Sequence, residues 1–348
     1  MPLVSSTYCP PRLLRHGHLA TVLPSLLPAP PEAWTRHQRR ELADGDFLDL
    51  AWLEHPNSTG KEPPRPLAIL SHGLEGSVQA TYIRGMARTL GSQGWDVLAW
   101  NYRSCGGLPN RLLRSYHSGE SGDLRLVIDH AALTYHRIAL IGFSLGGNIT
   151  LKYAGESPPH PAVQAAIAIS APVDLASSAS VLDQRRGNRL YLHRFLKTLL
   201  AKAAAKARQF PGSIDPARLA KIRTIRDFDE HVTAPLHGFA GAEDYWSRAS
   251  SLPHLTNIRV PALLLNALND PLLDTPSFPT AAALETIGFH LETPAHGGHV
   301  GFPDFRPGWQ PWHERRVLEF LESSHTESSH HRSACCAYAL PGEKILPI

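Results

Sequence analysis

Only four cysteines occur among the 348 residues, and they are spaced neither like a zinc site nor like a disulfide framework. Cys335 and Cys336 are adjacent near the end of the chain, where they cannot easily form disulfides that stabilise a core. Cys9 and Cys105 lie far from them in the sequence. We therefore expect all four to be reduced thiols, as is usual in the cytoplasm.

Long hydrophobic runs are also missing. No apolar stretch approaches the roughly 20 residues that a membrane span needs, and prolines interrupt the N-terminal segment, which lacks the continuous apolar stretch of a signal peptide. The formal net charge is only +3, and the basic pI of 8.7 arises without a block of lysines or arginines. These absences predict a cytoplasmic protein with no transmembrane segment and no nucleic-acid partner.

The chain does contain an alternation of strands and helices. Short apolar runs predict buried parallel strands, and the segments between them carry apolar residues at helical spacing. This alternation predicts an α/β fold with a doubly wound, mostly parallel sheet. The expected strands are 47–54, 67–70, 95–100, 138–141, 165–170, 262–267 and 289–293, and the expected helices are 81–93, 122–135, 148–155, 277–285 and 312–321.

Residues 176–257 interrupt the alternation, because they show helical patterns and no convincing strand. They lie between two strands of the expected sheet, so we interpret them as a helical lid inserted into the core. Within the lid, residues 190–208 combine an apolar face with basic side chains opposite, and packing on the body is favoured over contact with a membrane surface. The apolar face consists of Leu192, Phe195, Leu196, Leu199 and Leu200.

These patterns divide the chain into four parts. Residues 1–40 are expected to form an N-terminal extension, and 41–175 together with 258–322 are expected to form the α/β core around the lid at 176–257. Residues 323–348 are polar and patternless, so they are expected to be a disordered tail.

A serine stands between a predicted strand and a predicted helix, with a glycine two residues away on either side. The segment Gly142-Phe143-Ser144-Leu145-Gly146 directly follows the apolar run at 138–141. A strand that turns into a helix within a few residues crowds both flanks of the turn, which requires glycine there, and it pushes the apical residue outward. This context predicts that Ser144 is a nucleophile.

A nucleophilic serine needs a base, and the base needs an acid that orients it. Asp270 follows a buried strand and is the favoured acid; Asp274 and Asp174 are rivals, although Asp174 is also placed to cap a helix. His299 follows two glycines after the last strand and is favoured as the base over His296. A metal site at these two histidines is disfavoured because no third ligand lies nearby.

An oxyanion hole requires two backbone amides, one after an early strand and one directly after the nucleophile. The turn at His72-Gly73 follows the strand at 67–70 and would bring the Leu74 amide beside the Leu145 amide. The His72 side chain fits a structural hydrogen-bond donor better than a second base. We expect neither a cofactor nor a metal ion.

Several blocks of the sequence resemble α/β-hydrolases, and specifically the YheT-like branch of predicted esterases. The resemblance covers about residues 12–322 and implies a Ser144–Asp270–His299 triad. One departure is Ser104, because family members usually carry glycine at that position. The blocks are HGHLATVLPSLL at 16–27, HGLEGS at 72–77, AWNYRSCGGLPNR at 99–111, YHSGESGDL at 116–124, GFSLGGN at 142–148, FDEHVTAPLHGF at 228–239, ALNDPLLD at 267–274 and HGGHVGF at 296–302.

The expected activity is hydrolysis of carboxylic esters of short- to medium-chain acyl groups through an acyl-enzyme on Ser144. Relatives in this branch look like carboxylesterases or lipid esterases, and some resemble alcohol acyltransferases, so acyl transfer is an alternative. An H-x4-D spacing at His299 and Asp304 does not decide between them, because twenty histidines make such a spacing common. A binding module with an inactive triad is the alternative from another class. The expected partner is a small acyl ester.

Overall fold

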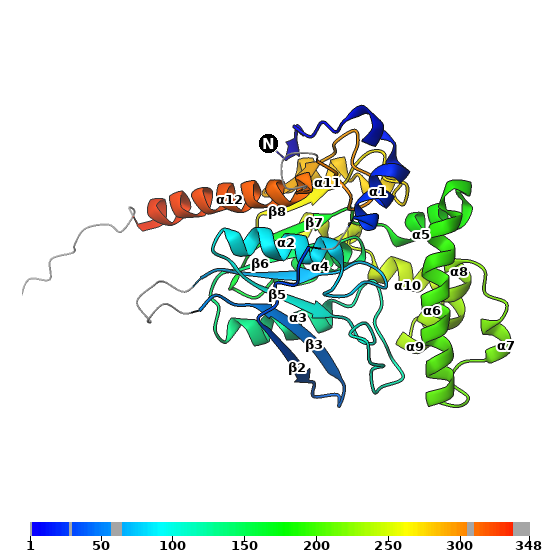
Figure 1. Ribbon diagram of the computed structural model, residues 1–348. Coiled ribbons are helices and arrows are strands. Elements are labelled where there is room, and N and C mark those ends of the chain that lie inside the picture. The colour runs from blue at the N-terminus through cyan, green and yellow to red at the C-terminus, as the bar shows by residue number, and fades with distance from the viewer. Residues whose placement is uncertain (1, 28–29, 57–64, 305–309, 337–348) are drawn as a thin grey trace, which may run out of the picture.

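The computed structural model describes residues 2–27, 30–56, 65–304 and 310–336, with side chains described as far as residue 324. Within these residues, the core is a nine-stranded sheet in the order β1-β9-β8-β7-β6-β4-β5-β3-β2 (Figure 1). Neighbouring strands pair in parallel, except that β3 is antiparallel to both β5 and β2. The strands are β1 (Leu3–Val4), β2 (Arg36–Glu41), β3 (Phe47–Leu53), β4 (Leu67–Ser71), β5 (Asp96–Asn101), β6 (Ile138–Phe143), β7 (Val163–Ile169), β8 (Ala262–Leu265) and β9 (Phe289–Glu292).

Helices cover both faces of this sheet, because its central strands are apolar on both sides. In β4, Ala68 and Leu70 pack toward α2 and α12, whereas Leu67 and Ile69 pack toward α3 and α4. The predicted doubly wound, mostly parallel α/β sheet is thereby confirmed. The helices of this core are α1 (Gly17–Leu26), α2 (Thr81–Ser92), α3 (Ser121–Ala132), α4 (Leu145–Glu156), α11 (Thr280–Glu285) and α12 (Trp312–Cys336).

Residues 176–257, the segment expected to form the lid, are all described by the structure and contain helices and turns but no strand. It has a small apolar core of its own, in which Trp246 and Phe228 are buried. Figure 1 shows the lid at one end of the sheet, with the long helix α6 running across that end. Its longer elements are α5 (Leu175–Gln184), α6 (Arg189–Gln209), the π-helical turn η3 (Asp229–Thr233) and α10 (Ala242–Ala249).

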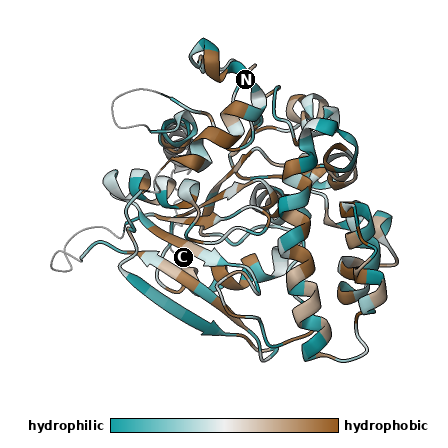
Figure 2. Cartoon of the chain, turned by 45° about the vertical axis from the view of Figure 1, so that its right-hand side comes forward, coloured by the Kyte–Doolittle hydropathy of each residue, from teal (hydrophilic) through white to brown (hydrophobic). Residues whose placement is uncertain are grey.

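The prediction of an N-terminal extension at residues 1–40 is wrong for two segments, which are strands of the sheet. Leu3–Val4 pairs with β9, and Arg36–Glu41 pairs along its whole length with β3. The sequence RHQRRE has no apolar pattern, because β2 is an edge strand that buries little of its surface; Figure 2 shows it as hydrophilic. Charged side chains on an edge strand also discourage pairing with other chains.

The predicted disordered tail is wrong in its first part, because α12 continues to Cys336. No glycine or proline occurs between residues 313 and 340, so nothing in the local sequence ends the helix near Leu321. Residues 337–348 of the expected tail lie outside the described residues, as do the side chains of Cys335 and Cys336, while Cys9 and Cys105 are free thiols. In the described part of the chain, no helix combines the length and the apolar character needed to cross a bilayer.

Candidate active site

Ser144 occupies a strained turn between β6 and α4. Its φ of 52° and ψ of −120° lie outside the regions that a side chain normally favours. The flanking glycines are required by close backbone approach, since a Cβ at Gly142 would overlap the carbonyl oxygen of Gly146, and a Cβ at Gly146 would overlap that of Ser71. The turn therefore projects the Ser144 side chain beyond the carboxyl end of the sheet, as the motif predicts.

His299 joins Ser144 to Asp270 in a continuous chain of contacts. Its Nε2 lies 2.8 Å from Ser144 Oγ, and its Nδ1 lies 2.8 Å from Asp270 Oδ2. The other carboxylate oxygen of Asp270 accepts a hydrogen bond from the Leu272 amide at 2.8 Å, and the side chain is fully buried. The carboxylate is thus fixed on both oxygens, and it holds the proton of the histidine on Nδ1 so that Nε2 is free to accept one from serine.

The rival residues lie elsewhere. Asp174 accepts a hydrogen bond from the Ser177 amide and caps α5. Asp274 caps the turn that follows it and pairs with Arg185 at 3.2 Å. His296 is half-buried and is not in contact with Ser144 through any of the hydrogen bonds among the described residues.

Leu74 and Leu145, the two residues expected to supply the oxyanion amides, line the same cavity as Ser144 and His299. Leu145 is the first residue of α4, so its N–H has no partner within the helix. The loop carrying Leu74 packs tightly on the serine, since a Cβ at Gly73 would lie 3.2 Å from the Cβ of Ser144. Both residues therefore lie next to Ser144, and the role of their amides as oxyanion donors stays a prediction.

The side chain and backbone of His72 stabilise the loop that carries Leu74. Its Nδ1 donates to the Gly73 carbonyl at 2.8 Å, and Tyr102 donates its hydroxyl to the His72 carbonyl at 2.6 Å. Burial lowers the pKa of His72 to about 3, so the ring stays neutral at physiological pH. Its contacts are those of a structural donor.

Ser104 keeps the backbone conformation that glycine favours. Its φ is 66°, in the left-handed region. Two short-range contacts compensate for the strain: its hydroxyl donates to the Asn110 side-chain oxygen at 2.6 Å and accepts from the Asn110 amide at 3.0 Å. The departure from the family glycine therefore leaves the loop in a glycine-like shape.

A two-chamber cavity leads away from Ser144 under the lid. The chamber at the serine has a volume of about 90 Å³, and its lid wall includes Phe195 and Trp246. A second chamber of about 100 Å³ continues beside Leu199 and Phe228, and the two share Leu145 in their linings. The apolar face of α6 thus contributes to the walls of both chambers, together with apolar residues of the core such as Leu145.

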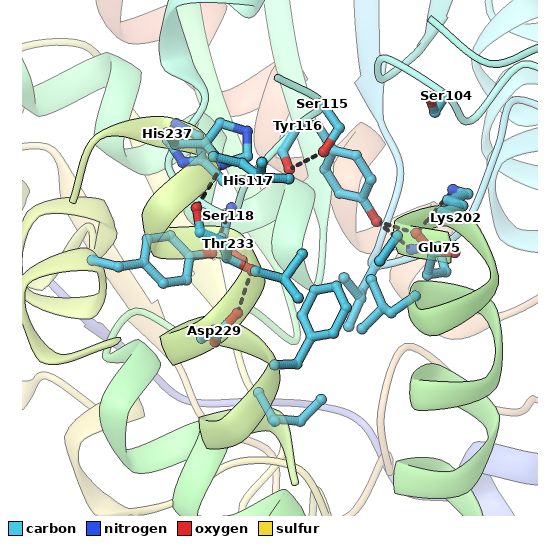
Figure 3. Close-up of a pocket in the computed structure, with 18 of the residues that line it drawn as sticks. Glu75, Ser104, Ser115, Tyr116, His117, Ser118, Lys202, Asp229, Thr233 and His237 are labelled. Carbon is cyan, nitrogen blue, oxygen red and sulfur yellow. Dashed lines mark hydrogen bonds and ion pairs between the residues drawn. The ribbon is translucent and has the colours of Figure 1, made fainter. Parts of the chain in front are cut away.

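The second chamber also carries polar groups that the sequence did not single out. Figure 3 shows the Glu75–Lys202 pair on one side of it and Asp229 with Thr233 on the other. Lys202 of α6 lies 2.9 Å from Glu75, which also accepts the Tyr116 hydroxyl at 2.6 Å. Glu75 follows Leu74 directly, so this ion pair ties the lid to the loop beside the serine.

Asp229 opens the π-helical turn and faces both chambers. Burial raises the pKa of its carboxyl to about 6, although the Thr233 hydroxyl and the Trp246 indole both donate to it. Turns of this kind often occur at functional sites. The resemblance block at 228–239 was the one signal in the sequence that pointed to this segment.

Thr21 is a further residue that sequence reasoning missed. Its Oγ1 accepts a hydrogen bond from the backbone N–H of His299 at 2.8 Å, although 278 residues separate the two positions. One residue earlier in the same loop, the backbone N–H of Gly298 donates to Asn269 Oδ1 at 3.0 Å. The N-terminal helix α1 and the Asp270 loop therefore hold the histidine in place together.

Comparison with known proteins agrees with this architecture. The family model described as alpha/beta hydrolase fold matches residues 66–304. The chain is 36% identical over 330 residues to the predicted esterase YheT of Escherichia coli strain K12, which covers 91% of this chain and 93% of that protein. It is 27% identical over 328 residues to human phospholipase ABHD3, covering 92% of this chain and 80% of that protein.

Two further likenesses extend the comparison. The monoacylglycerol lipase of Saccharomyces cerevisiae is 30% identical over 281 residues, covering 76% of this chain and 60% of that protein. The solved structure of the Pyrococcus furiosus esterase Pf2001 covers 85% of this chain and 99% of its own, with a TM-score of 0.54 and 17% identity, which shows the shared fold. The chain therefore belongs to the α/β-hydrolase family, and within it to the YheT-like proteins.

Proposed function

We propose that this protein is a serine esterase that hydrolyses carboxylic esters of short- to medium-chain acyl groups. The contact chain Ser144–His299–Asp270, with 2.8 Å at each step, carries this proposal. The names of its relatives, which include an esterase, a phospholipase and a monoacylglycerol lipase, support ester bonds as the target.

In the first half of the reaction, Ser144 Oγ attacks the ester carbonyl carbon while His299 Nε2 takes the hydroxyl proton. The carbonyl electron pair moves onto oxygen, and the amides of Leu74 and Leu145 donate hydrogen bonds to the resulting oxyanion. The intermediate collapses as the bond to the alcohol oxygen breaks. The proton on Nε2 passes to the departing alcohol, and the acyl group remains on Ser144.

In the second half, water takes the place of the alcohol. Nε2 accepts a proton from the water as its oxygen attacks the acyl carbon, and the same two amides stabilise the second oxyanion. The bond to Ser144 Oγ then breaks, Oγ recovers the proton from Nε2, and a carboxylic acid leaves. Throughout, Asp270 stabilises the imidazolium and keeps its orientation.

The cavity supports the preference for acyl length. Each chamber is smaller than the roughly 150 Å³ apolar cavity that is known to bind benzene. Phe195 contributes to the apolar wall of the chamber at the serine, and Leu199 to that of the second chamber. Chains of short to medium length fill such a space. Asp304 pairs with Arg315 at 2.8 Å, so the H-x4-D spacing has a structural explanation that does not involve acyl transfer.

Labelling with a fluorophosphonate probe tests the proposal directly. We expect the wild-type protein to be labelled and to hydrolyse p-nitrophenyl butyrate, and Ser144→Ala to lose both while keeping the wild-type melting temperature. The matched control is Ser178→Ala, which lines the same chamber without contacting His299 through any hydrogen bond among the described residues. An unlabelled wild-type protein would support the binding-module alternative, and continued turnover by Ser144→Ala would refute the assignment of the nucleophile.

A further inference from the structure

Helix α1 presents an apolar face to solvent. On its inner side, Ala20 is buried, and Gly17 and Thr21 contact the loops that carry Asp270 and His299. Leu19, Val22 and Leu26 lie at i, i+3 and i+7, so they share the opposite side, and each is more than a third exposed, with Leu26 at 73%. A surface helix of a globular protein normally places polar residues there.

Neighbouring segments enlarge this apolar face. Leu13 precedes α1, Leu190 is the second residue of α6 with 81% of its surface exposed, and Leu268 stands next to Asn269. These segments are in mutual contact: a Cβ at Gly187 would lie 2.9 Å from the His18 ring, and Asn269 Nδ2 donates to the Arg15 carbonyl at 2.8 Å. Figure 1 shows α1 close to the lid end at α5.

Positive charge surrounds these side chains. Arg12, Arg15, Arg186 and Arg189 are exposed, and none of them forms an ion pair with another described residue. No aspartate or glutamate occurs in residues 12–27 or 185–194. In the segment that carries Leu268, Asp270 is buried against His299, and Asp274 is neutralised by an ion pair with Arg185. A set of exposed apolar side chains within a cationic border complements a surface that is apolar inside and anionic at its rim.

We propose that this α1 surface docks onto a bilayer that contains anionic phospholipids. We define the α1 surface as the exposed side chains Leu13, Leu19, Val22, Leu26, Leu190 and Leu268 with Arg12, Arg15, Arg186 and Arg189. The exposed apolar side chains enter the interfacial region, and the arginines pair with lipid phosphates. A second copy fits less well, because a twofold contact through this surface would bring its arginines face to face.

Docking through the α1 surface would place the site at the lipid. The inner side of α1 holds the His299 loop through Thr21. Helix α6, whose first turn carries Leu190, lines both chambers farther along its length. This consequence, that the esters reach Ser144 from a membrane, rests on the proposed function. The docking itself does not.

Co-sedimentation with vesicles of phosphatidylcholine, alone or mixed with phosphatidylglycerol, measures the docking. We expect the wild-type protein to bind the mixed vesicles. The double variant Leu19→Gln with Leu26→Gln should have a roughly 100-fold lower partition coefficient, about tenfold for each leucine. The control is Leu126→Gln with Leu133→Gln, two exposed leucines at α3, which should bind as wild type does. Arg12→Gln and Arg189→Gln should each lower binding about fivefold at low salt only, and only to the mixed vesicles.

Hydrolysis of dissolved p-nitrophenyl butyrate by all variants would show that they are folded. The proposal is overturned if wild type does not bind the mixed vesicles, or if the α3 control loses binding as fully as the α1 variant. It is also overturned if sedimentation equilibrium reveals a dimer that Leu26→Gln dissociates, because the surface would then be a protein interface. A wild-type protein that binds vesicles but hydrolyses no ester would refute the proposed function and leave the docking intact.

Discussion

Replacing Asp270 with asparagine removes one charge while keeping the shape of the side chain. In the wild-type protein, one carboxylate oxygen accepts from the Leu272 amide and the other contacts His299 Nδ1, each at 2.8 Å. The asparagine oxygen will retain the bond to the Leu272 amide, since its amino group cannot accept one. The amino group must then face His299 and donate to Nδ1, which forces the imidazole proton onto Nε2.

A histidine protonated on Nε2 cannot take the proton of Ser144, whose Oγ lies 2.8 Å from that nitrogen. The variant also loses the buried negative charge that stabilises the imidazolium. Loss of the correct tautomer in a serine–histidine–aspartate site lowers kcat by about 10⁴, which corresponds to about 5 to 6 kcal/mol of transition-state stabilisation. The fold should survive, because the substitution conserves volume and the contact with Leu272.

Steady-state kinetics with p-nitrophenyl butyrate, together with thermal melting, measure this effect. Asp174→Asn and Asp274→Asn are the matched controls, and both should keep kcat within about threefold of wild type, because these carboxylates cap helical turns away from His299. An Asp270→Asn variant that keeps more than a tenth of wild-type kcat would refute the assignment of the acid. A control that loses more activity than Asp270→Asn would place the acid at the end of another strand.

Three further perturbations test the lid, a buried carboxyl and the serine turn. Phe195→Ala with Leu199→Ala should flatten the dependence of kcat/KM on acyl length, because each methylene buried against this wall contributes up to about 0.8 kcal/mol. Glu314→Gln should make stability less dependent on pH. Burial raises the pKa of this carboxyl to about 7, above its ordinary value of 4.5, so the folded state holds the proton more tightly and wild type loses up to about 3 kcal/mol as the pH rises from about 4.5 to 7. Gly146→Ala should lower the free energy of unfolding by about 2 to 4 kcal/mol and reduce turnover, because the new Cβ would overlap the carbonyl oxygen of Ser71.

Each of these has a control on the same element or of the same kind. Leu192→Ala with Leu200→Ala alters α6 at positions outside both chamber linings, and an equal flattening there would mean that the lid acts only through its stability. For Glu314→Gln, the free energy of unfolding is measured by urea unfolding between pH 4 and 8. The control is Glu319→Gln, at an exposed position of α12, which should show the same pH dependence of stability as wild type. An unchanged pH dependence in Glu314→Gln would refute the inference that the buried Glu314 carboxyl holds its proton in the folded state. Gly122→Ala, on an exposed turn of α3, should be tolerated.

The sequence determined those features that depend on neighbouring residues. A buried apolar run, a serine between two glycines and an amphipathic continuation define the turn at Ser144, because the steric demand for glycine is local. The same holds for the parallel core strands, whose unbroken apolar runs reflect burial on both faces. Asp270 and His299 followed from chain order, since polar residues after successive parallel strands meet at one edge of the sheet.

Only the tertiary structure decided the features that depend on distant partners. Arg36–Glu41 is a strand because β3 offers it an unpaired edge, and no pattern in its own charged sequence encodes that. Thr21 holds His299 across 278 residues, and Glu75 meets Lys202 across 127, because folding the lid and α1 over the sheet brings these groups together. The outer face of α1 carries apolar residues, which in the sequence alone would indicate a buried helix. Only the packed structure shows that this face is turned to solvent. Short-range steric constraints and the periodicity of apolar residues depend on consecutive residues, so they can be recognised in the sequence. Contacts between distant segments form only when the whole chain buries its core.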